Sequence, residues 1–161
     1  MDRIPPPDDA DERTTLTAFL EYLRACCVAK LDGVSEDAAK QAQVPSGTSI
    51  YWLGTHLAAV EINQFQRILD GRLPERIVPP APPDMEDDTI GAVIERYQTA
   101  CEESRQILAT YDDLGAMGRG VGRKGDRRSV RWVLTHMIEE TARHAGHLDI
   151  LREQLDGTAG R

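Results

Sequence analysis

The chain has 161 residues, the size of one domain whose hydrophobic core needs no disulfides. Its 19 basic and 27 acidic residues give a net charge of −8, which argues against a nucleic-acid partner. No apolar run approaches the roughly 18 residues of a membrane span, and the start of the chain lacks the apolar core of a signal peptide. We therefore expect a cytoplasmic protein with no membrane partner.

Helical spacing of apolar residues recurs in four places, and strand-like alternation never persists. A Pro- and Asp-rich tail over residues 1–11, which we expect to be flexible, comes first. The spacing and the capping residues then predict helices over 12–31, 50–70, 88–111 and 130–156. Residues 73–83 are too rich in proline for a helix. The sequence thus predicts an all-α four-helix bundle over residues 12–157, with a long crossover between its second and third helices.

The predicted core of the first helix includes two adjacent cysteines, Cys26 and Cys27, and an aromatic residue, Phe19. Adjacent cysteines on a helix rarely bond to each other, and Cys101 is alone. No pair has the C-x-x-C spacing of metal or redox motifs. We expect all three to be reduced thiols that serve as small core residues.

Three of the four histidines lie in the last predicted helix. His136, Glu140 and His144 are spaced by four residues and form one row, and His147 falls within the same arc of about 80°. This arc overlaps the apolar face, so the row points toward the core. Burying imidazoles and a carboxylate costs several kcal/mol unless they are paired, and a divalent cation pairs with both. The row therefore indicates a metal site.

A third ligand has to come from another helix, and His56 lies on the inward face of the second predicted helix. His56, Glu140 and His144 would form a set of two histidines and one carboxylate, which is typical of zinc sites that keep an open position for chemistry. Histidine and glutamate also suit nickel, iron and manganese, so zinc is the first expectation among four metals.

The two remaining histidines lie one turn to either side of the pair on the last helix. Each of His136 and His147 could be a hydrogen-bond partner of a metal ligand, an alternative ligand or a general base. His147 is the better catalytic candidate, because its neighbour Gly146 leaves room for a substrate. Glu61 is expected to point away from the ion, where it would either contact one of the metal ligands or face solvent. Residues 118–128, rich in Gly and Arg, predict a flexible loop that could seat an anionic substrate.

These residues resemble the DinB-like superfamily of four-helix metalloproteins, and within it the mycothiol-dependent branch of maleylpyruvate isomerase N-terminal-like domains and thiol S-transferases. The resemblance is carried by Thr48–Glu61, which contains His56, and by Ser129–His147. Glu140 stands where the superfamily pattern has a middle His, and His147 where it has a Gln. The resemblance implies a divalent metal that holds a low-molecular-weight thiol of the mycothiol type as thiolate, and a homodimer.

The leading hypothesis is therefore a metal-dependent thiol S-transferase in which the thiolate attacks a small electrophile, with His147 or His136 moving the proton. A metal-dependent hydrolase is the first alternative, weakened because a Glu used as ligand leaves no carboxylate base beside it. A non-catalytic metal-binding module of a stress response is the second. Three ligands and an open position argue against it, since structural zinc sites usually have four ligands.

Overall fold

The computed structural model describes residues 3–73, 75–79, 88–122 and 124–159. Four long helices form the bundle: α1 (Glu12–Leu31), α3 (Ile50–Glu61), α4 (Ile90–Leu108) and α5 (Val130–Asp156). A short helix, α2 (Glu36–Lys40), lies between α1 and α3, and a π-helix, η1 (Ile62–Leu69), continues α3. The described residues contain no strand, only an isolated bridge between Met117 and Ser129. The predicted all-α class is confirmed.

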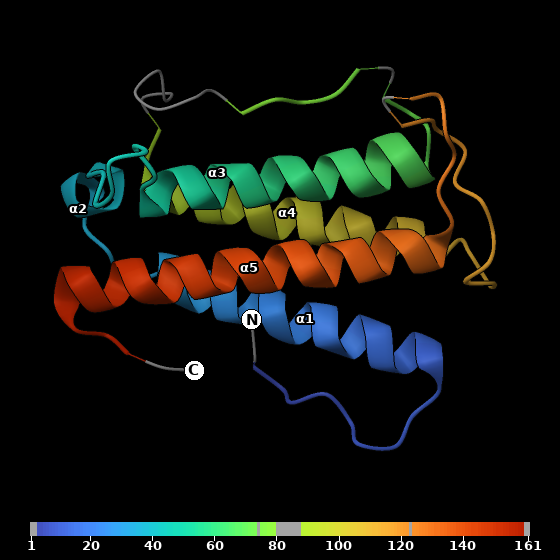
Figure 1. Ribbon diagram of the computed structural model, residues 1–161, viewed down its shortest axis with the longest axis horizontal. Helices are drawn as coiled ribbons and strands as arrows, with labels where there is room; N and C mark the ends of the chain where they lie inside the picture. Colours follow the sequence, from blue (N-terminus) through green and yellow to red (C-terminus); the bar gives the residue numbers. More distant parts are fainter. Residues whose placement is uncertain (1–2, 74, 80–87, 123, 160–161) are drawn as a thin grey trace.

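The four helices pack as two close pairs (Figure 1). α1 lies mainly against α5 and α3 mainly against α4, whereas α3 and α5 touch along a less extensive seam. Two clusters of buried apolar side chains fill the interior, one toward α2 and one toward the loop before α5. None of the helices in the described residues is both long and apolar enough to cross a membrane.

The helices begin where capping side chains predict. Asp11, Ser49, Thr89 and Ser129 each accept a hydrogen bond from the backbone N–H three residues later, at the first turn of α1, α3, α4 and α5. α1 has the predicted bounds, and α5 ends at Gly157, whose positive φ of 73° suits a glycine. α4 is shorter than the predicted 88–111. After its last turn, the N–H groups of residues 110 and 111 donate to the carbonyls three residues earlier, in tight turns that end the α-helical pattern.

The predicted second helix is correct in extent but not in type. From Ile62 the helix widens to a π-helix, with a hydrogen bond of 2.8 Å from the Asp70 N–H to the Phe65 carbonyl. Glu61, Phe65 and Leu69 are all completely buried along this stretch. Helix α2 was not predicted, because its five residues are too few to show a helical period.

A buried ion pair joins α1 to the end of α3. Arg24 donates from Nε and Nη2 to the two carboxylate oxygens of Glu61, at 2.8 and 2.6 Å, and Ser104 of α4 donates to Glu61 Oε2 at 2.8 Å. Arg24 also donates to Glu21 at 2.6 Å. The solvent-facing role predicted for Glu61 is wrong: its side chain is fully buried, because these three donors replace water around the carboxylate.

Both connections at the loop end of the bundle are held by hydrogen bonds. The Asn63 side chain donates to the Ile77 carbonyl at 2.7 Å and accepts from the Ile77 N–H at 2.9 Å, so part of the crossover is fixed along η1. Residues 74 and 80–87 of the predicted crossover region lie outside the described residues. The Gly/Arg-rich loop was predicted to be flexible, yet Arg119 and Gly120 donate to the carbonyls of Leu69 and Ile68 at 2.8 and 3.0 Å.

We predict that Gly120→Ala destabilises the protein. A Cβ at residue 120 would lie 1.9 Å from the Arg67 carbonyl oxygen, so the loop must move away from η1. Overpacking of this kind costs about 1–3 kcal/mol of unfolding free energy, measurable by urea denaturation. Gly146→Ala is the control, because no atom lies within 4 Å of its added Cβ in the exposed middle of α5. That variant should gain about 0.5–1 kcal/mol. Equal stability of Gly120→Ala and wild type would contradict the loop docking.

Candidate metal centre

Three side chains from two helices converge on the seam between α3 and α5. His56 comes from α3, and Glu140 and His144 come from successive turns of α5. One potential ligand atom from each of the three lies within 4.8 Å of the others. The Nε2 atoms of His56 and His144 approach the same carboxylate oxygen, Oε1 of Glu140, at 3.1 and 3.2 Å. The structure thus brings together the three residues predicted as ligands, and their binding of a metal remains a prediction.

The ring of His56 is held in place by aromatic contacts. Trp52, one turn earlier on α3, stacks on it with ring centroids 5.0 Å apart and an interplanar angle of 18°. The His144 ring meets it edge-on at 4.7 Å. The side chains of His56, Glu140 and His144 are 18, 17 and 11% exposed. The centre is therefore shielded from bulk water but still reachable by a small molecule.

The electrostatics of the site favour the protonation states that bind cations. Burial raises the pKa of the Glu140 carboxyl, but the hydrogen bond from His56 and the contacts with His144 outweigh burial and hold the pKa below its ordinary value. Burial, aided by His56, lowers the pKa of the His144 imidazole despite Glu140. At neutral pH the centre thus offers a carboxylate and a neutral imidazole, as metal ligation requires. The donor set fits a divalent ion, with borderline nitrogen and hard oxygen donors converging on one point.

His147 contacts the centre through His144. It is exposed, and the two Nδ1 atoms lie 3.3 Å apart, with rings in an edge-on arrangement at 5.3 Å. If His144 held a cation through Nε2, its Nδ1 would carry the proton and would donate a hydrogen bond to His147 Nδ1. Such a partner fixes the tautomer and orientation of a ligating histidine.

His136 lies one turn before Glu140 and belongs to a separate aromatic stack. Its ring is 4.9 Å from the Trp132 ring, and its Nδ1 is 3.8 Å from an oxygen of Glu139. The guanidinium of Arg128 lies 3.7 Å from the centroid of Trp132. Within the described residues, His136 makes no hydrogen bond to the three candidate ligands. Its side chain is 29% exposed, so it can exchange protons with solvent.

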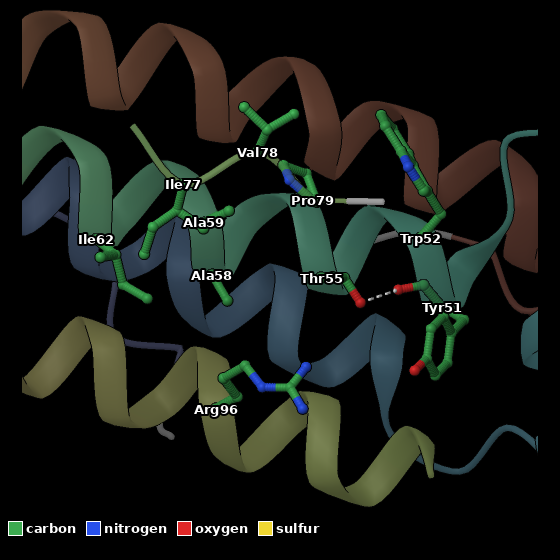
Figure 2. A pocket seen from close by; sticks show the side chains of 10 residues that line it. All are labelled: Tyr51, Trp52, Thr55, Ala58, Ala59, Ile62, Ile77, Val78, Pro79 and Arg96. Carbon is green, nitrogen blue, oxygen red and sulfur yellow. Dashed lines mark hydrogen bonds between the residues drawn. The ribbon is translucent and has the colours of Figure 1, made fainter. Parts of the chain in front are cut away.

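A cavity of about 210 Å³ opens beside the centre, between α3, α4 and residues 77–79 of the crossover. Figure 2 shows its lining, with Ile77, Val78 and Pro79 on the crossover side and Arg96 on the α4 side. Trp52 lines this cavity and also stacks on His56, so it links the two. Trp52 was not predicted as a site residue, although its position four residues before His56 places both on one helix face.

Comparison with known proteins identifies the family of the chain. Among curated proteins, the chain is similar to the uncharacterized protein YkkA of Bacillus subtilis (strain 168), with 22% identity over 111 residues. The match covers 62% of this chain and 62% of YkkA, less than two thirds of that relative. The sequence profile of the mycothiol-S-transferase family matches residues 15–157, which contain the candidate metal centre, α3, α4, α5 and all of α1 except its first three residues. The chain therefore belongs to the mycothiol-S-transferase family.

Proposed function

We propose that this protein is a metal-dependent thiol S-transferase that joins a low-molecular-weight thiol of the mycothiol type to a small electrophile. The convergence of His56, Glu140 and His144 across the α3–α5 seam is the observation that carries the proposal. These residues would hold a divalent ion, zinc first, with nickel, iron and manganese as the other metals that suit the set. A bound ion supplies a Lewis acid that keeps a thiol as thiolate at neutral pH.

In the proposed reaction the thiol loses its proton and its sulfur forms a bond to the electrophilic carbon. The leaving group departs with the electron pair of the broken bond and takes up a proton, so RSH + E–X gives RS–E + HX. His136 is half-buried near the centre and bonded to none of the candidate ligands, which makes it the group proposed to move the proton. His147 is proposed to position His144, because its hydrogen bond goes to that ring.

The cavity beside Trp52 is proposed to take an apolar part of one cosubstrate. Its walls include Ala58, Ala59, Ile62 and Ile77, which suit an apolar group, and Trp52 joins the cavity to His56. We further propose that the enzyme works in the cytoplasm as a homodimer, in line with the resemblance noted above.

The hydrolase alternative has less support. Within the described part of the chain, Glu140 is the one carboxylate grouped with the two histidines, and as a ligand it is not free to act as a base toward water. The group of three, without His136 or His147, also fits a centre with an open position better than a closed structural site.

Cobalt substitution tests the proposal. A mycothiol-like thiol added to the Co²⁺-loaded protein should give a sulfur-to-cobalt charge-transfer band, and it should accelerate conjugation of a test electrophile only when metal is present. The His144→Ala variant serves as the control and should show neither effect. Hydrolysis of model esters without thiol should stay at background. A metal-dependent esterase rate, or cobalt spectra that no cellular thiol changes, would overturn the transferase assignment.

A further inference from the structure

Three arginines meet in a second cavity, at the end of the bundle where η1 contacts the Gly/Arg-rich loop. This cavity of about 210 Å³ is lined by Asn63, Gln64, Arg67, Arg76 and Arg128, and we name it the arginine pocket. Its arginines come from η1, the crossover and the loop, three segments distant in sequence. In Figure 1 the loop, drawn in orange, lies against the end of the helix formed by α3 and η1.

The positive charge of the arginine pocket is poorly compensated, although the chain as a whole carries a net charge of −8. Within the described ranges, neither Arg67 nor Arg76 forms a salt bridge, and Arg128 has only Asp126, at 3.5 Å. The Nε of Arg67 is buried and has no hydrogen-bond partner in the same ranges. A buried donor without a partner is costly, and neighbouring guanidinium groups repel one another. An oxyanion in the pocket would remove both penalties.

Guanidinium groups are suited to this task, because their planar fork of N–H donors matches the oxygens of carboxylate and phosphate. The side-chain amides of Asn63 and Gln64 add polar walls to the pocket.

Hydrogen bonds to the backbone of the crossover, the loop and η1 hold the segments that carry the arginines. The two bonds between Asn63 and Ile77 hold the crossover on η1 and so place Arg76 next to Arg67. On the loop side, Gly120 donates to the Ile68 carbonyl at 3.0 Å, and Arg127 donates to the Gly118 carbonyl at 2.7 Å. These contacts hold Arg128 at the other wall of the pocket.

The arginine pocket and the metal centre lie along the same two helical segments, α5 with the loop before it and α3 with its continuation η1. On α5, Arg128 stacks on Trp132, whose ring contacts His136, one turn before Glu140. On α3 and η1, Gln64 follows His56 by eight residues, which is about two helical turns.

We propose that the arginine pocket is an anion subsite, which binds a carboxylate or phosphate group of a cosubstrate that reacts at the metal centre. This inference rests on the proposed function for the identity of the cosubstrate. The anion-binding property of the pocket does not depend on it and can be measured separately.

Titration of the full-length protein with inorganic phosphate, followed by NMR or calorimetry, tests the pocket directly. Arg76→Gln and Arg67→Gln should each weaken phosphate binding at least about tenfold, as expected for a lost charge-assisted hydrogen bond. Arg76 is exposed, so its substitution leaves the core intact. Arg143→Gln is the matched control, because Arg143 is an exposed arginine of α5 paired with Glu139, outside the pocket. Phosphate affinity in Arg76→Gln equal to that in wild type would overturn the inference.

Kinetics of the metal-loaded protein identify the cosubstrate. Paired electrophiles with and without a carboxylate are each combined with a neutral and a carboxylated thiol. Arg76→Gln should raise the KM of the carboxylated partner at least about tenfold and leave the neutral pair unchanged, and the affected partner shows which cosubstrate reaches the pocket. Transfer without any such selectivity overturns the subsite and leaves the proposed function standing. Phosphate binding without transfer by any pair supports the pocket and overturns the proposed function.

Discussion

The His144→Ala variant should retain the folded bundle but lose nearly all bound divalent metal. His144 would supply one of three protein donors, and its removal leaves His56 and Glu140 on different helices with no third donor grouped with them in the described residues. Affinity should fall by more than the 10- to 100-fold typical of changes to groups that only contact a ligand. His56→Ala and Glu140→Ala should behave alike. Metal content measured by mass spectrometry, together with competition against a chelator, gives the affinities.

Two kinds of control sharpen this experiment. His147→Ala removes the partner of His144 Nδ1 and should weaken metal binding within the 10- to 100-fold range. Glu139→Gln removes an exposed carboxylate adjacent to Glu140 in sequence, and it should leave metal binding unchanged. If all three ligand variants still hold about one ion per chain, the proposed ligand set is incorrect.

The local parts of the structure could be predicted from the sequence. The bounds of α1 and α5 follow from caps and apolar period, which depend on residues within one or two turns. The row of Glu140 and His144 has the same origin, because residues four apart share a helix face. His56 was placed with them because it lies on the inward face of its own helix, and two inward faces of a bundle meet.

The rest depends on contacts between distant segments. Phe19 has the spacing of a core residue, yet it is 45% exposed. The burial of Glu61 requires Arg24 on another helix, and the sequence around residue 61 does not indicate that the two residues pair. The arginine pocket depends on the docking of crossover and loop onto η1, so Arg67 and Arg76 could not be grouped with Arg128 from spacing alone.

The buried ion pair of Arg24 and Glu61 should give the largest stability effect in the protein. Glu61→Ala leaves the guanidinium of Arg24, which is 2% exposed, without its bidentate partner, and Ser104 without its acceptor. Breaking a buried pair by removing one member typically costs about 3 to 5 kcal/mol. Urea denaturation of the metal-free protein measures the loss without any contribution from metal binding.

A double variant separates the cost of an unpaired charge from the value of the pair itself. Arg24→Met with Glu61→Leu removes both charges and keeps apolar volume, and replacing a buried ion pair in this way is often neutral or stabilising. We therefore expect the double variant to be more stable than Glu61→Ala. Glu12→Gln, which breaks the exposed pair between Glu12 and Arg131, should leave the midpoint unchanged. A Glu61→Ala variant as stable as wild type would contradict this prediction and would mean that water reaches the Nε and Nη2 donors of Arg24, which bind Glu61 in the wild type.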